Sequence, residues 1–177
     1  PVVIQSTPVG VVRTGDSNDR QPFNIYAKPF NHKDTRPRIG IVVTGLGLSD
    51  AATEAAIQAL PGGVTLAFAP YSAKLNSWIT LAHASGHEVL INIPMEPNNF
   101  PPYDPGPQAL LTSLSTNDNL NRLDLALGQA IGYVGVMDFL GSRFTASRKH
   151  MLPILNAINQ RGLLYFDSGS SPASTAP

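Results

Sequence analysis

The stretch IGIVVTGLGLSDAATEAAIQALPGGVTLAFA, residues 39–69, contains the pattern that decides the fold. It opens with a β-branched apolar run, residues 39–44, which is typical of a strand buried on both faces. Ser49 can cap a helix over residues 50–60. A second apolar run, residues 64–69, follows a glycine pair. Strand, helix, glycine and strand in this order indicate a parallel α/β fold.

The same unit repeats along the rest of the chain. Further strands are predicted at 88–93, 133–138 and 163–167, and further helices at 72–85, 115–131 and 147–160. Ser72 can cap the first of these further helices. The third of the four predicted helices starts with the capping pattern Ser115-Thr-Asn-Asp118 and carries apolar residues at helical spacing up to Ile131. The segment 96–115 is long and rich in Pro and Asn, and a loop of that size in a compact domain is usually functional.

Residues 1–37 differ from the repeating region. Short apolar pieces alternate there with Gly, Asp, Asn and Pro, without a helical period or a hairpin signal. We therefore predict a linker or loosely docked arm over 1–37 and one folded domain over 38–177. The first residue is a proline and no signal peptide is present, so we expect a mature form or a fragment.

The composition excludes several classes of function. The 177 residues are 42% apolar and only 14% charged, and the charges sum to zero, so no field attracts nucleic acid or an anionic membrane. No apolar run reaches about 18 residues, so no transmembrane segment is expected. Cysteine is absent, which excludes thiolate catalysis and thiolate metal sites.

Polar side chains follow the predicted strands at their carboxyl ends, where ligands bind in parallel α/β folds. These residues are Asn92, Glu96, Asp138, Ser142, Arg143, Asp167 and Ser168. We expect them to form one cleft. The alternative is that Arg143 only pairs with Asp138 or Asp167 to hold loops together.

Other chemistries find little support. His83 and His87 have the spacing of a metal pair, but Ser85-Gly86 interrupts the helix between them and His87 enters a strand at its amino end. Gly45-Leu-Gly47 lacks the third glycine of a dinucleotide-binding loop. A nucleophilic serine in a G-x-S-x-G turn does not occur. Structural histidines and no metal site are therefore predicted.

Five short sequence motifs occur in order along the chain: residues 41–47 (IVVTGLG), 86–97 (GHEVLINIPMEP), 104–112 (DPGPQALLT), 141–145 (GSRFT) and 166–168 (FDS). Together they resemble the divergent polysaccharide deacetylase family. The resemblance implies a hydrolase fold, a distorted (β/α) barrel of about seven strands, and export to the periplasm or cell envelope. Since the chain stops soon after its fifth predicted strand, either the barrel is open or later strands lie outside this sequence.

The resemblance also implies a divalent metal such as zinc, held by one Asp and two His, which polarises an acetyl carbonyl and activates water. The family's base and first ligand, an Asp-Asp pair, correspond here to Thr44 and Gly45. The two His ligands correspond to Asn92 and Phe139. Base and ligands are thus replaced together, whereas Glu96, Ser142, Arg143, Asp167 and Ser168 match the family pattern.

Three hypotheses remain open, and whether the chain is an enzyme is not decided. The first is a pseudoenzyme of carbohydrate metabolism that binds a glycan or cell-wall fragment through Asn92, Glu96, Ser142, Arg143 and Ser168, without a cofactor. The second is an active deacetylase or other carbohydrate hydrolase that uses Asp138 and Asp167 as an acid/base pair. The third is a scaffold that binds a protein partner through residues 98–107. A polar cleft with an exposed aromatic such as Tyr71, Trp78 or Tyr103 would favour the first.

Overall fold

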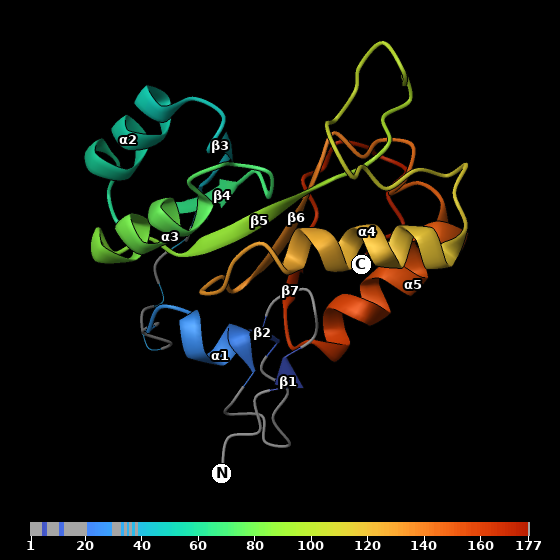
Figure 1. The fold of residues 1–177 in the computed structure, drawn as a ribbon. Coiled ribbons are helices and arrows are strands. Elements are labelled where there is room, and N and C mark those ends of the chain that lie inside the picture. The colour runs from blue at the N-terminus through green and yellow to red at the C-terminus, as the bar shows by residue number, and fades with distance from the viewer. Residues whose placement is uncertain are drawn as a thin grey trace.

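The computed structural model describes residues 21–29, 33, 35, 37 and 39–176, together with the backbone of 5–6 and 11–12. Its main sheet has parallel strands that pair in sequence order: β3 (Val42–Leu46), β4 (Thr65–Phe68), β5 (Val89–Pro94), β6 (Gly135–Phe139) and β7 (Leu164–Phe166). One helix lies between each strand and the next: α2 (Asp50–Ala59), α3 (Leu75–Ala84), α4 (Thr116–Leu127) and α5 (Arg148–Gln160) (Figure 1). The predicted α/β fold is confirmed. The sheet has five strands in the described part of the chain, against about seven that the resemblance implied, and is consistent with a distorted barrel that is open.

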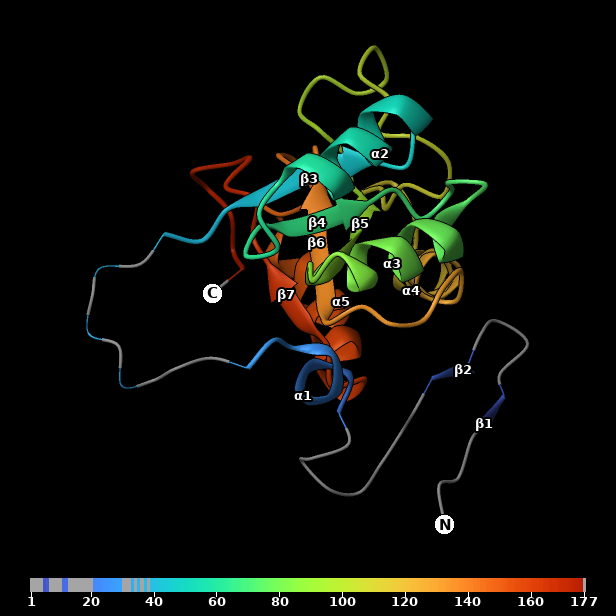
Figure 2. The ribbon, with the colours of Figure 1, turned by 90° about the vertical axis from the view of Figure 1, so that its left-hand side faces the viewer.

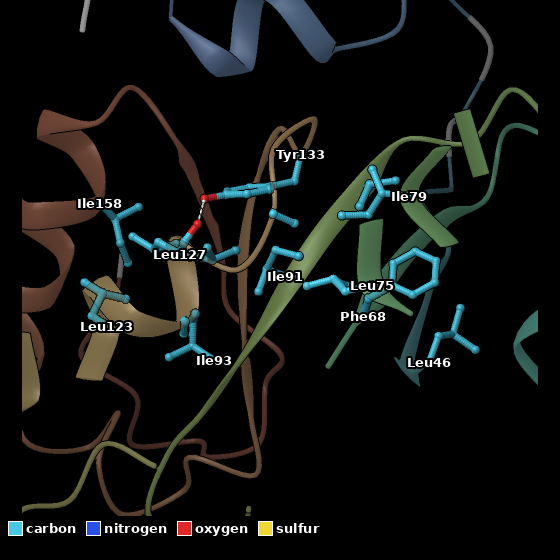
Figure 3. Close-up of a cluster of buried hydrophobic side chains, with 14 of the residues drawn as sticks. Leu46, Phe68, Leu75, Ile79, Ile91, Ile93, Leu123, Leu127, Tyr133 and Ile158 are labelled. Carbon is cyan, nitrogen blue, oxygen red and sulfur yellow. Dashed lines mark hydrogen bonds between the residues drawn. The ribbon is translucent and has the colours of Figure 1, made fainter. Parts of the chain in front are cut away.

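The sheet separates two apolar clusters. Successive strand residues point to opposite faces, so Val89, Ile91 and Ile93 of β5 pack against the helices and form the main core with them (Figure 3). Leu90 points the other way and belongs to a smaller cluster with Ala67, Val134 and Met137. Asn92 shares the face of Leu90, which places its amide at the carboxyl end of the strand on the side away from the helices.

The segment before the domain contains elements that the sequence did not predict. A short helix, α1 (Pro22–Tyr26), lies beside the amino ends of the strands, and β1 (Gln5–Ser6) pairs antiparallel with β2 (Val11–Val12) (Figures 1 and 2). Tyr26 packs against the smaller cluster. Lys28 is bonded to the domain twice: its Nζ donates to the Gly62 carbonyl at 2.7 Å and its backbone N–H to Glu88 Oε1 at 2.6 Å. The rest of the predicted arm falls largely outside the described residues, and the division at residue 37 stays a prediction.

Three element boundaries differ from the expected ones for local reasons. Helix α3 begins at Leu75, and the Ser72 hydroxyl that was expected to cap it is buried without a partner. Helix α4 ends at Leu127, so Ile131 lies beyond it and is exposed. Strand β3 runs on to Leu46 because Gly45, at φ +76°, accommodates a shift in register. In the described part of the chain, no helix is long and apolar enough to cross a membrane.

Candidate functional site

An open cleft lies at the carboxyl ends of β3 and β6, and we call it the rim cleft. Its volume is about 420 Å³, and it is lined by Thr44, Pro97, Asn99, Tyr103, Met137, Asp138, Phe139, Leu140, Ser142, Ser168 and Ser170. Tyr103 comes from the long loop after β5 and is 62% exposed. Of the predicted site residues, the cleft therefore brings together Asp138, Ser142 and Ser168.

Asp138 lies at the floor of the rim cleft and is 1% exposed. Its Oδ1 accepts hydrogen bonds from Tyr165 Oη at 3.0 Å and from the Ser168 backbone N–H at 2.8 Å. Its Oδ2 accepts from the hydroxyls of Ser168 at 2.5 Å and Ser170 at 3.2 Å. Four donors therefore hold this carboxylate and join the end of β6 to the loop after β7.

Asp167 follows β7 but does not line the rim cleft. Its Oδ1 accepts from the Gly169 backbone N–H at 2.9 Å, which closes a local turn. Both Asp138 and Asp167 lie close enough to act on Tyr165: burial raises the pKa of its phenol, the charge and hydrogen bond of Asp138 raise it further, and the charge of Asp167 adds to this. The assignment of the two carboxylates as an acid/base pair remains a prediction.

Glu96 is almost fully buried beneath the long loop. Its Oε2 accepts from the backbone N–H of Thr112 at 2.5 Å and from its hydroxyl at 2.7 Å, and its Oε1 lies 3.3 Å from Arg143 Nη1. The alternative that Arg143 pairs with Asp138 or Asp167 is therefore wrong, because its ion-pair partner among the described residues is Glu96. This carboxylate ties the two ends of the loop together and holds it against the segment after β6. Substrate binding by Glu96 and Arg143 stays a prediction.

Ser142 has a different hydrogen-bonding role from the serines after β7. Its Oγ accepts from the backbone N–H of Asn98 at 3.0 Å, so its own proton is free for a ligand. Leu140, two residues earlier, adopts φ +66°, which is the left-handed region that costs a side chain about 1 kcal/mol or more. The chain thus turns sharply at the cleft mouth and presents Ser142 to it.

A second, closed pocket lies on the other side of Phe139. It is lined by Gly45, Leu48, Ala69, Pro70, Tyr71, Asn92, Pro94 and Phe139, and it has no room for a water molecule. Asn92, 2% exposed, accepts at Oδ1 from Thr44 Oγ1 at 3.0 Å and from the Gly45 backbone N–H at 3.1 Å. Because a backbone N–H can only donate, this fixes the orientation of the amide. Its Nδ2 is buried without a partner.

The sequence profile of the divergent polysaccharide deacetylases matches residues 41–177. The chain belongs to this family. It is 28% identical to the uncharacterized protein YibQ of Escherichia coli over 132 residues, and 26% identical to an uncharacterized protein of Haemophilus influenzae over 140 residues. These matches cover 74% and 78% of this chain but only 40% and 49% of the two relatives, so the chain spans less than half the length of either.

A solved structure of the same fold agrees with this membership. The crystal structure of an uncharacterized protein from Agrobacterium tumefaciens superposes with a TM-score of 0.86 at 38% sequence identity. The match covers 97% of this chain and 67% of that one. The fold of this divergent polysaccharide deacetylase domain is therefore shared along almost all of its length.

The residues at the family's metal position do not fit a metal ion. Gly45, Asn92 and Phe139 all line the closed pocket, and they offer no side chain, an amide and a hydrocarbon ring respectively. The amide oxygen of Asn92 is already occupied by two donors. In the part of the chain that the structure describes, no group of three or more His, Cys, Asp or Glu could hold a metal ion. A zinc of the family type, with three protein ligands, is not accommodated by this set.

The two histidines with metal-like spacing are structural, as predicted. His87 is buried, and its ring nitrogens lie 2.8 Å from the Val64 carbonyl and 3.1 Å from the Ile57 carbonyl. His83 Nε2 lies 2.5 Å from the Gly132 carbonyl. These contacts join helices to loops rather than forming a metal site.

Sequence reasoning missed three residues of the site: Thr112, Tyr165 and Ser170. Tyr165 could have been found, since it lies near the carboxyl end of the predicted strand 163–167, two positions before Asp167. Ser170 carries a weaker signal, a second serine after Ser168-Gly. Thr112 carries no sequence signal, because its contact with Glu96 spans 16 residues of irregular loop.

Proposed function

We propose that this domain binds a carbohydrate or cell-wall glycan in the rim cleft and has no metal-dependent deacetylase activity. The observation that carries the proposal is the difference between two neighbouring hollows, the closed pocket and the rim cleft. The family's metal position is a closed apolar pocket without a donor set, whereas the adjoining rim cleft is open and has hydroxyl groups in its mixed polar and apolar lining. The proposed pseudoenzyme would therefore retain a ligand site beside a lost metal site.

The chemistry of the rim cleft suits a sugar. Tyr103 offers an exposed aromatic face, on which the apolar face of a sugar ring can stack. Ser142 can donate to a sugar oxygen, and the serines after β7 can accept from a sugar hydroxyl. Trp78, another candidate aromatic, is buried in the core and cannot serve as such a platform. The exposed tyrosine and the hydroxyl groups of the lining support glycan binding, whereas the apolar part of the lining, formed by Pro97, Met137, Phe139 and Leu140, is the feature that the protein-scaffold hypothesis would use.

Titration with β-1,4-linked N-acetylglucosamine and glucosamine oligosaccharides, followed by calorimetry and amide chemical shifts, tests the binding. We expect shifts at Ser142 and Ser168 and a loss of affinity of about tenfold in Tyr103→Ala, the effect of one lost aromatic contact. Phe23→Ala is the matched control, because Phe23 is an exposed aromatic on α1 at the opposite end of the strands. Binding that is insensitive to Tyr103→Ala, or no binding of any glycan, would contradict the proposal.

The loss of activity needs its own assay. Acetate release from acetylated oligosaccharides should stay at background with added Zn²⁺, Mn²⁺, Mg²⁺ or Ca²⁺. Release that EDTA abolishes, together with near-stoichiometric metal in the purified protein, would show an active metalloenzyme and refute the pseudoenzyme.

We also propose that the domain works in the periplasm or cell envelope, on the basis of the family resemblance. Fractionation of cells that express the full-length protein tests this. Recovery of the protein in the cytoplasmic fraction alone would exclude it.

A further inference from the structure

In the part of the chain that the structure describes, no ion pair places a cation at the floor of the rim cleft. Those between side chains of the described residues are Lys74–Asp50, Arg143–Glu96 and Arg161–Asp124. Arg143 is the cation next to the cleft, and the buried Glu96 neutralises it. Neither Asp138 nor Asp167 forms an ion pair with any side chain in the described part of the chain. Among the described residues, the partners of the Asp138 carboxylate are thus hydroxyl and N–H dipoles.

The hydrogen bonds to Asp138 determine how the cleft serines meet a ligand. Ser168 and Ser170 both direct their hydroxyl protons at Asp138 Oδ2. A hydroxyl has a single proton and two lone pairs, so each of these oxygens can only accept from a ligand. Ser168 Oγ already accepts from the Ser170 backbone N–H at 3.2 Å, which leaves it one lone pair for a ligand. Two acceptors backed by a buried carboxylate, which forms no ion pair with a described side chain, therefore line one side of the cleft.

We propose that this side of the rim cleft binds the primary ammonium group of an amino sugar. An ammonium carries three donors, no acceptor and a positive charge, which matches two serine oxygens in front of Asp138. An acetamido group at the same place would be neutral, would have a single N–H, and would bring a carbonyl oxygen toward acceptors. The inference rests on the proposed glycan binding and specifies which glycan: one with a free amine is preferred over its N-acetylated form.

The size of the preference follows from the environment of the charge. Asp138 is 1% exposed, so water screens it poorly, and opposite charges a few ångströms apart attract strongly in such a site. Removal of water from the ammonium opposes this attraction. We therefore expect a net preference of about tenfold, which weakens only modestly with salt because the carboxylate is buried.

The test compares two probes on the full chain at about pH 5.5, where sugar amines carry protons and ordinary carboxyl groups do not. The probes are the β-1,4-linked glucosamine trisaccharide and its fully N-acetylated counterpart, and the readout is the ratio of their affinities by calorimetry. We expect a ratio of about ten in favour of the amine. Asp138→Asn and Ser170→Ala should each reduce the ratio toward one.

Glu54→Gln is the matched control for charge. It also removes one carboxylate, on exposed α2, where Glu54 contacts only the Gln58 amide in the described structure, and it should leave the ratio unchanged. Ser170→Ala keeps the test decisive if Asp138→Asn fails to fold, since Ser170 is exposed and loses a single hydroxyl.

The outcomes separate the two proposals. Equal affinities, tighter binding of the acetylated sugar, or a ratio that Glu54→Gln lowers as much as Ser170→Ala would overturn the ammonium site and leave glycan binding intact. Failure of both trisaccharides to bind would overturn the ammonium site together with glycan binding.

Discussion

Replacement of Glu96 by alanine should destabilise the domain far more than replacement of its ion-pair partner Arg143. The Glu96 side chain is 6% exposed and accepts from two groups of Thr112, so Glu96→Ala leaves a partly buried N–H and hydroxyl without this partner. Hydrogen bonds to a charged group contribute about 1.5–3 kcal/mol each, so we expect a loss of about 3–5 kcal/mol. The Arg143 side chain is 55% exposed, and water can replace it at Glu96, which limits the cost of Arg143→Ala to about 1 kcal/mol or less.

Urea unfolding of both variants at constant m-value measures this difference. The stability of Glu96→Gln should fall between those of the two alanine variants. Its amide oxygen can still accept from Thr112, but its NH₂ group then faces the Arg143 guanidinium, which is also a donor. Hydrogen exchange should also speed up in residues 97–112 of Glu96→Ala and not of Arg143→Ala. Equal destabilisation by the two alanine variants would refute the reasoning, since it would mean that the ion pair, rather than the contact with Thr112, holds the loop.

Three further outcomes are expected. Tyr133→Phe should cost about 1–2 kcal/mol, because the phenol donates to the Leu127 carbonyl at 2.7 Å at the end of α4 (Figure 3), and denaturant unfolding measures it. Above pH 10 the free energy of unfolding should fall as the pH rises, because burial and Asp138 raise the pKa of Tyr165 above its ordinary value of 10.0 and the unfolded chain therefore releases this proton first. The loss should be about 1.4 kcal/mol per pH unit. Tyr165→Phe should remove that share of the slope in a series of urea unfolding curves at different pH values. Deletion of residues 1–37 should lower the melting temperature by only a few degrees and leave a single calorimetric transition; loss of cooperativity would show that α1 is part of the core.

The repeating pattern of strand and helix could be predicted from the sequence because the core dictates it. The apolar runs of β4, β5 and β6 are buried where expected, and the carboxyl ends follow from their direction. The residues that meet at the rim were partly predictable for the same reason, since Asp138, Ser142 and Ser168 lie at or just after the carboxyl ends of parallel strands that end at one edge.

The partners of those residues could not be predicted. The sequence does not indicate whether Arg143 forms an ion pair with Glu96, Asp138 or Asp167. The path of the long loop brings it to Glu96. The helix start at Ser72 was predicted from cap preference alone, but the packing of that turn buries the hydroxyl instead. Helix α1 has too few residues for its apolar period to stand out, and Lys28, which follows the helix, contacts Glu88 and Gly62 at distances of 60 and 34 positions along the chain.

The order of the sheet also bears on how the chain is made. Since β3, β4, β5, β6 and β7 pair strictly in sequence, each strand that leaves the ribosome finds its neighbour already synthesised. No strand has to wait for a later one to be inserted at its side, so the sheet can grow by addition at one edge during translation. Arrest of synthesis after β5 should therefore leave a nascent chain that already protects β4 from proteolysis, whereas a sheet with a late central strand would not.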